Sequence, residues 1–206
     1  MWHDVEQNTD EWLDLRAGKV TGSSIGKIMA NYGKAFGDPA KSLAAVIAVE
    51  QLTGKRVQSC GYSNSDMDRG HEQEPAARML YEETFFTDVD NGGFYDNGDT
   101  GSSPDGRVND NGLIEIKSAI VSIHYERIRK NNYDSQYRWQ LPFNLRESGR
   151  EWIDFVSYCE DFPEDKRLFV IRKTKDQFAE EFRMIESRLE EFWLIVDDIK
   201  KTIRAM

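Results

Sequence analysis

The segment around residues 105–117 constrains the fold of this chain more than any other. Asp-Asn-Gly at 110–112 is typical of a hairpin turn, and it leads into an Ile-Glu-Ile-Lys run at 114–117. Because side chains alternate along a strand, the two isoleucines point one way, and Glu115 and Lys117 the other. The strands that carry Asp105 and Glu115 should lie side by side. The sequence therefore predicts two carboxylates and a lysine on one face of a sheet.

This pattern indicates a particular chemistry. Two carboxylates brought together suit a hard, oxygen-preferring cation such as Mg²⁺, and a lysine beside them can orient or help deprotonate a water on the metal. That set suffices to hydrolyse a phosphodiester. However, charged residues make up 31% of the chain, so an apolar-Glu-apolar-Lys run is also what a half-solvated strand looks like. From this segment alone, both interpretations stay open.

Length and charge bound the fold and the partners. With 206 residues, of which 39% are apolar, we expect a single globular domain over 1–206. Helices alternating with short strands predict an α/β fold with a mixed central β-sheet flanked by helices. The net charge of −10 argues against a nucleic-acid partner, although a local basic groove can coexist with an acidic exterior. A metal-dependent nuclease also needs clustered carboxylates.

The cysteines and the N-terminus indicate the compartment. Cys60 and Cys159 lie far apart without a Cys-x-x-Cys pair, so neither a disulfide framework nor a zinc site is expected. The first residues are polar and acidic, unlike a signal peptide. No apolar run approaches the roughly 18 residues of a membrane span. We expect a soluble, cytoplasmic protein with no membrane association.

Periodicity and capping signals locate the elements. Helices are expected at 9–16, after Val20 with Thr21 or Ser23 as the cap, and at 38–52, 66–85, 125–130, 135–147 and 176–204. Strands are expected as three short ones within 92–120, and at 152–158 and 167–171. Residues 31–38 form a glycine-containing loop, expected to be mobile, and residues 55–65 are polar and irregular.

Five motifs occur in a fixed order along the chain. They are Arg16-Ala-Gly-Lys-Val-Thr-Gly-Ser23, Gly70-His-Glu-Gln-Glu74, Ser103-Pro-Asp105-Gly, Glu115-Ile-Lys117 and Tyr137-Arg-Trp-Gln140. Together they resemble the lambda-exonuclease branch of the PD-(D/E)xK nucleases, the phage alkaline exonucleases. The resemblance runs from about Thr9 to Glu147, and it implies a restriction-endonuclease-like PD-(D/E)xK core.

The resemblance assigns the central residues by position. Asp105 and Glu115 match the metal-binding carboxylates of the family, and the backbone carbonyl of Ile116 is implied as a further ligand. Lys117 matches the lysine that positions the attacking water. Glu74 matches the glutamate of a Gly-x-x-x-Glu motif on a helix, with Glu72 as its rival.

Gln140 matches the glutamine of the Tyr-x-x-Gln element of the family, with a surface amide as the alternative. The chain departs from the pattern two positions later, where Pro142 replaces a second glutamine. That puts the role of a second amide in doubt, and a kink of the helix near Pro142 is expected.

Arg16 and Ser23 match a pocket for the 5′-terminal phosphate of the degraded strand, and Lys19 and Ser24 are possible additions to it. A guanidinium gives bidentate phosphate contacts, and amides at a helix N-terminus add affinity for anions. The plainer alternative makes Arg16 a cation that complements the dipole at a helix C-terminus.

Two further groups are candidates either for DNA contact or for ordinary surface. They are the loop residues Tyr32, Lys34 and Phe36, and the basic residues Arg127, Arg129, Lys130 and Arg138.

As a whole, the resemblance implies a Mg²⁺-dependent 5′-to-3′ exonuclease, with Mn²⁺ as a substitute. It would degrade one strand of linear double-stranded DNA to mononucleotides from DNA ends, and leave 3′ overhangs for single-strand-annealing recombination. A homotrimer, a single-strand annealing protein as partner, and a phage or prophage gene expressed in the cytoplasm of a bacterial host are implied too. Two alternatives remain: a PD-(D/E)xK endonuclease of restriction or junction-resolving type, and a non-catalytic acidic binding domain.

Overall fold

The computed structural model describes residues 1–57 and 65–206, apart from the side chains of residues 65–68 and 71. Cys60 and most of the irregular 55–65 segment lie outside the described residues. Cys159 is a free, buried cysteine.

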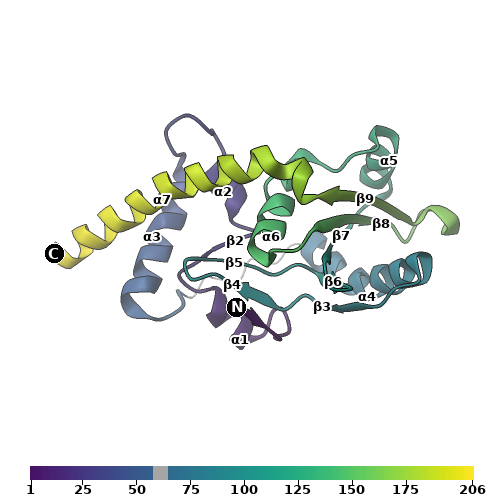
Figure 1. The fold of residues 1–206 in the computed structure, drawn as a ribbon, viewed down its shortest axis with the longest axis horizontal. Coiled ribbons are helices and arrows are strands. Elements are labelled where there is room, and N and C mark those ends of the chain that lie inside the picture. Colours follow the sequence, from purple (N-terminus) through teal and green to yellow (C-terminus); the bar gives the residue numbers. More distant parts are fainter. Residues whose placement is uncertain (58–64) are drawn as a thin grey trace.

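A five-stranded mixed sheet forms the centre of the molecule (Figure 1). Its strands, in spatial order, are β3 (Val89–Asn91), β6 (Gly106–Val108), β7 (Gly112–Ser118), β8 (Trp152–Tyr158) and β9 (Leu168–Thr174). The β7–β8 pair is parallel and the other pairs are antiparallel. The central position of β7 explains why its residues from Gly112 to Ile116 are all buried, with apolar side chains on both faces.

The predicted hairpin is present. β6 and β7 pair antiparallel, with Gly106 opposite Ile114 and Val108 opposite Gly112. Between them, Asn109 adopts a left-handed conformation with a φ of 49°, which asparagine tolerates better than most residues. The turn therefore places the two strands side by side, as the sequence predicts.

A second, smaller mixed sheet was not expected. It contains β1 (Trp2–His3), β4 (Phe94–Asp96), β5 (Thr100–Ser102) and β2 (Val20–Thr21), in that order, with β2 parallel to β5. The expectation of three strands within 92–120 was wrong, because four lie there. Strands of two or three residues are too short to show a periodicity of their own.

The helices lie close to their expected places. They are α1 (Asp10–Arg16), α2 (Ile25–Met29), α3 (Asp38–Thr53), α4 (Ser65–Phe85), α5 (Val121–Lys130), α6 (Gln140–Ser148) and α7 (Ala179–Ala205). The short 3₁₀ helices are η1 (Ser135–Tyr137), η2 (Glu164–Lys166) and η3 (Lys175–Phe178). The helix expected over 135–147 is thus a 3₁₀ turn followed by α6. Within the described part of the chain, none of the helices combines the length and apolar character that a bilayer crossing requires.

Two helices enclose the five-stranded sheet. Ala77 and Tyr81 of α4 pack on the face that carries Ile114 and Ile116. On the opposite face, α6 packs with Leu113, through apolar residues such as Leu141. The alternation predicted along β7 is confirmed, because the isoleucines face α4 while Glu115 shares the α6 face.

The long helix α7 closes the other end of the core, where Figure 1 shows it running across α2 and α3. The loop at 31–38 is attached to it: Phe36 packs edge-on against Phe192, and the Arg188 guanidinium lies 3.5 Å over the Phe36 ring. Arg188 Nη2 also donates a hydrogen bond to the Lys34 carbonyl. Phe36 therefore belongs to the packing against α7, and neither DNA stacking nor a plain surface loop describes it.

A buried carboxylate joins α4 to the sheet. Asp154 on β8 is fully buried, and it accepts hydrogen bonds from the Tyr81 hydroxyl at 2.7 Å and from Arg172 Nε and Nη2 at 2.8 Å each. Such a carboxylate is tolerated only because its oxygens are paired.

Replacing Tyr81 with phenylalanine should lower the free energy of unfolding by about 1–3 kcal/mol, since Asp154 loses a buried donor. Urea denaturation followed by circular dichroism measures the change. Tyr125→Phe is the matched control because that side chain is exposed. Equal effects of the two substitutions would contradict the assignment.

Candidate active site

The structure brings Asp105, Glu115 and Lys117 together. Asp105 lies just before β6, where its backbone N–H donates to the Ile114 carbonyl at 3.1 Å. Its Oδ2 accepts from the Ile116 N–H at 2.6 Å, so the carboxylate is held against β7. Lys117 Nζ lies 2.5 Å from Glu115 Oε1 and 3.8 Å from Asp105 Oδ2. One ammonium thus lies between two carboxylates.

Helix α6 covers Glu115. This carboxylate is only 1% exposed, and Gln140 Nε2 donates to its Oε1 at 2.5 Å. Asn144 Nδ2 donates to its Oε2 at 2.8 Å. Gln140 and Asn144 are four residues apart, so they share one face of the helix. Gln140 is therefore placed in the site, and its alternative as a surface amide does not hold.

Pro142 does not kink α6. The helix begins at Gln140, so Pro142 lies in its first turn, where backbone N–H groups have no partner within the helix in any case. The side chain is buried. The expectation of a kink was wrong, because the helix does not continue upstream of Gln140: residues 135–137 form a separate 3₁₀ turn.

Glu74 reaches the same site from α4. Its carboxylate is half-buried and lies 3.7 Å from Arg78 Nη2, and the same guanidinium donates to the Asp105 carbonyl at 2.5 Å. Glu72 is exposed. The geometry favours Glu74 over Glu72 as the helix glutamate near the carboxylate pair.

The site concentrates negative charge. Burial and then the charge of Asp105 raise the pKa of Glu115, although Lys117 acts against this. Burial and Asp105 likewise raise the pKa of Glu74. Burial alone would lower the pKa of Lys117, but the attraction of Glu115 and Asp105 outweighs it and raises that pKa. Three carboxylates around one ammonium leave an excess of negative charge that a cation would offset.

The donor chemistry fits Mg²⁺ or Mn²⁺. Asp105, Glu115 and the Ile116 carbonyl offer hard oxygen ligands, which Mg²⁺ prefers, and one or two carboxylates are its usual protein share. Within residues 1–57 and 65–206, no group of three or more Asp, Glu, His or Cys side chains has metal-binding geometry. The candidate ligands that the sequence predicted, two carboxylates and the Ile116 carbonyl, do not include a third carboxylate.

Arg16 forms a second cluster. Its Nη2 donates to Ser23 Oγ at 2.9 Å and to Thr21 Oγ1 at 3.3 Å, and the guanidinium lies 4.0 Å over the Trp12 ring. Burial lowers the pKa of Arg16 to about 10. Among the described residues, Arg16 has no ion pair with a carboxylate. A half-buried cation whose partners are hydroxyl groups is suited to an anion.

Lys19 and Ser24 are engaged elsewhere. Lys19 Nζ pairs with Asp96 Oδ1 at 2.9 Å. Ser24 is the N-cap residue of α2, in place of the expected Thr21 or Ser23, and its hydroxyl accepts from the Thr21 N–H at 2.8 Å. The structure thus gathers Arg16 and Ser23 but leaves Lys19 and Ser24 in structural contacts.

Two residues that the sequence did not single out connect the clusters. Trp12, which stacks on Arg16, donates its indole N–H to Ser103 Oγ at 2.6 Å, and Ser103 precedes Asp105 by two positions. Asn144 contacts Glu115 and also lies against Gly22, between Thr21 and Ser23. In the sequence, Trp12 could have been noticed because it lies next to the Arg16 motif, and Asn144 because it follows Gln140 by four residues.

One member of the expected basic cluster, Arg127, has a structural role. Arg127 is 3% exposed and pairs with Asp134 through Nη2 at 2.7 Å, so its assignment to a DNA groove or a solvated face was wrong. Arg129 and Lys130 pair with Glu126 on an exposed face, and Arg138 lies 4.6 Å over the Trp139 ring.

Arg127 belongs to a buried network beneath Lys117. It donates to the Lys117 carbonyl at 3.3 Å and to Ser157 Oγ at 2.9 Å. His124 Nε2 lies 2.9 Å from the Lys166 carbonyl, which can only accept, so Nε2 carries the proton. The Ser157 hydroxyl then donates to His124 Nδ1 at 2.8 Å. This arrangement accommodates a neutral imidazole, which the burial of His124 also favours by lowering its pKa.

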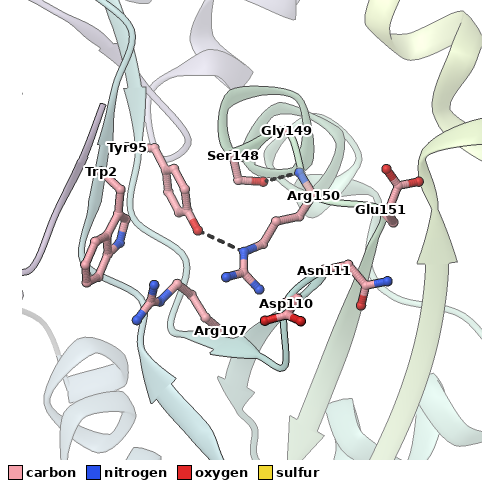
Figure 2. A pocket seen from close by; sticks show the side chains of 9 residues that line it. All are labelled: Trp2, Tyr95, Arg107, Asp110, Asn111, Ser148, Gly149, Arg150 and Glu151. Carbon is pink, nitrogen blue, oxygen red and sulfur yellow. Dashed lines mark hydrogen bonds between the residues drawn. The ribbon is translucent and has the colours of Figure 1, made fainter.

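A pocket of about 400 Å³ lies beyond the N-terminal end of β7 (Figure 2). Arg107 and Arg150 border it, with Arg107 stacked on Trp2 and Arg150 Nε bonded to the Tyr95 hydroxyl. None of the expected site residues lines this pocket.

Comparisons with known proteins place the whole fold among known nucleases. The LHK-Exo structure, an alkaline exonuclease from Laribacter hongkongensis, matches with 30% identity and a TM-score of 0.77, over 96% of this chain and 99% of that one. LHK-Exo in complex with dAMP matches with 31% identity and a TM-score of 0.78, over the same shares. A phage-related exonuclease from Haemophilus somnus 129PT shares the fold, with 19% identity, a TM-score of 0.67 and coverage of 90% and 96%. No curated protein matches this chain.

The mixed α/β fold is thus that of the lambda-exonuclease-like nucleases, as the motifs predicted, and the second sheet is an addition that they did not predict. A model of the YqaJ-like viral recombinase domain matches residues 11–151. The chain belongs to the YqaJ-like viral recombinase family, among proteins of the phage alkaline exonuclease type.

Lowering the pH should destabilise the protein through His124. Burial lowers the pKa of His124, so the unfolded chain binds the proton more readily, and stability present above the ordinary pKa of about 6.5 is lost as pH falls. From about pH 7.5 to about pH 5.5, the His124→Asn variant should lose less unfolding free energy than the wild type. For one proton, the difference cannot exceed about 1.4 kcal/mol per pH unit.

Urea titrations at the two pH values measure this difference. His3, which is partly exposed, supplies the control variant His3→Asn. The same pH dependence in wild type and His124→Asn would contradict a neutral, buried His124.

Proposed function

We propose that this chain is a metal-dependent 5′-to-3′ exonuclease that degrades one strand of linear double-stranded DNA to mononucleotides. The observation that carries the proposal is the pairing of two clusters. The first is the carboxylate pair with Lys117, which suits phosphodiester hydrolysis. The second is Arg16 with its hydroxyl partners, which suits a terminal phosphate. Trp12 connects them, because it stacks on Arg16 and donates to Ser103, two positions before Asp105 in the chain.

Asp105, Glu115 and the Ile116 carbonyl would hold the metal. When bound, Mg²⁺, or Mn²⁺ in its place, supplies Lewis-acid chemistry: it acidifies water and offsets charge on the scissile phosphate. Lys117 is the residue that orients the attacking water and controls its proton, because its ammonium already lies between the two carboxylates. Gln140 holds Glu115 in place, and Glu74 adds a carboxylate at the border of the site.

Arg16 and Ser23 would bind the 5′-phosphate of the strand being degraded. The guanidinium offers paired N–H donors, and the absence of a carboxylate partner among the described residues leaves its charge available to an anion. Lys19 and Ser24 would act only indirectly, through the loop that carries Ser23. A phosphate held here sets the polarity of digestion. The dAMP bound to the related LHK-Exo supports a mononucleotide as product.

Family membership supports the wider role. The enzyme would act on double-stranded DNA ends and leave 3′ overhangs for a single-strand annealing protein. We propose a homotrimer, encoded by a phage or prophage and acting in the cytoplasm of the bacterial host. If the three subunits form a ring around the DNA, the net charge of −10 is compatible with DNA binding, because only the inner surface that faces the DNA needs positive charge.

Substituting Lys117 with alanine should reduce mononucleotide release from 5′-phosphorylated linear duplex DNA by at least about 10²-fold, within the usual range for a group that manages a proton. Release of acid-soluble nucleotides measures the rate. Chelation by EDTA should abolish the wild-type rate, and Mg²⁺ or Mn²⁺ should restore it. Degradation of closed circular DNA at the linear rate would instead favour the endonuclease.

Arg16→Ala should remove the preference for phosphorylated ends, because the guanidinium is the charged partner of the terminal phosphate. The measurement compares kcat/KM for 5′-phosphate and 5′-hydroxyl duplexes. The ratio should fall toward one in the variant, mainly by loss of the faster rate. Arg183→Ala, an exposed position on α7, is the control. An unchanged ratio in Arg16→Ala would refute the phosphate site while leaving the metal site standing.

A further inference from the structure

Asn144 contacts both Glu115 of the carboxylate pair and the loop carrying the hydroxyl partners of Arg16. Its Nδ2 donates to Glu115 Oε2 at 2.8 Å. Its Oδ1 lies against Gly22, where an added Cβ would come within 2.2 Å of it. Asn144 is 1% exposed, so both contacts are made away from solvent.

The orientation of this amide follows from Glu115. The amide turns its NH₂ group toward Glu115 and its carbonyl toward Gly22, which suits an ionised carboxylate, since that group only accepts hydrogen bonds. The buried Oδ1 has no hydrogen-bond partner among the described residues. An unpaired buried carbonyl costs free energy.

The position on α6 explains why residue 144 can do this. Gln140 and Asn144 lie one helical turn apart and donate to different oxygens of Glu115. Residue 142 points to another side of the helix, since two residues correspond to about 200° of rotation. Asn144 thus supplies a second amide to the carboxylate although Pro142 stands where a second glutamine was expected.

We propose that Asn144 is a positioning residue that couples the loop Thr21–Ser23 to the metal-binding carboxylate Glu115. This inference rests on the proposed function, because it presumes the metal site and the phosphate site. Any shift of the loop against Gly22 moves the amide, and the amide sets the orientation of Glu115. Outer partners of metal ligands commonly change metal affinity by about 10–100-fold when removed.

The first test measures Mn²⁺ binding by calorimetry without DNA. Asn144→Ala should weaken binding about tenfold or more. Asn97→Ala is the matched control: Asn97 Nδ2 also donates to a buried carboxylate, Glu147 Oε2, at 2.8 Å, away from the site. Thermal unfolding of each variant checks folding, and Asn144→Ser replaces the alanine variant if that one does not fold.

The second test uses the contact with Gly22. Gly22→Ala should weaken Mn²⁺ binding about as much as Asn144→Ala, although Gly22 is no metal ligand, because the new methyl group pushes the amide away. In the Asn144→Ala background the same substitution should add less than about a twofold effect, since the obstructing Oδ1 is gone. A general loss of stability would give additive effects instead.

The third readout is the end preference. In Asn144→Ala, the ratio of kcat/KM for 5′-phosphate and 5′-hydroxyl duplexes should fall, while Asn97→Ala keeps the wild-type ratio. If wild type binds Mn²⁺ and degrades DNA but Asn144→Ala has unchanged metal affinity and end preference, the inference fails and the proposed function stands. If wild type neither binds Mn²⁺ nor degrades linear DNA, both are overturned.

Discussion

The burial of Glu115 on the central strand is the constraint on which the site depends. Moving a carboxylate out of water is costly unless its oxygens are hydrogen-bonded, and this one is 1% exposed. Its donors come from three places along the chain: Lys117 on the same strand, and Gln140 and Asn144 on α6. Pairing both oxygens of Glu115 with these donors fixes how α6 lies on the sheet. The packing of α6 and the arrangement of charges are therefore one structural problem.

The same principle extends outward from the site. Arg127 supports the Lys117 carbonyl from below and is itself balanced by Asp134. On the other face of the sheet, Asp154 is paired by Arg172 and by a tyrosine of α4. Each buried charge in these groups has a partner from a different element. The elements that carry them can pack in few other ways, because separating a pair leaves an unpaired buried charge.

Much of the site could be predicted because its residues obey local rules. Strand alternation placed Glu115 and Lys117 on one face, and the turn at 110–112 placed Asp105 beside them. Gln140 came from its motif. Asn144, by contrast, has only its four-residue spacing from Gln140 as a local signal: it matters because of Glu115, 29 residues away, and of Gly22, more than a hundred residues away. Contacts between distant segments depend on how helices settle on a sheet, which periodicity does not specify.

The misassigned residues follow the same logic. Arginine is usually exposed, yet Arg127 is buried and donates to Ser157, which is 30 residues away. Phe36 lies in a loop, yet it is partly buried against Phe192 and Arg188 of α7. The sequence did not predict the second sheet, because strands of two or three residues carry too few side chains to show an alternating pattern.

The sequence by itself determined the hairpin, the carboxylate pair with its lysine, the family resemblance and the places of the helices. These follow from short-range backbone preferences and from motifs read in order. The tertiary structure alone decided that Arg16 meets hydroxyl groups and, among the described residues, no carboxylate, that Lys19 is used in an ion pair, and that one asparagine joins the two clusters. The physical reason is that burial and the pairing of charges are properties of the packed chain, in which each polar group must find its partner wherever the fold places one.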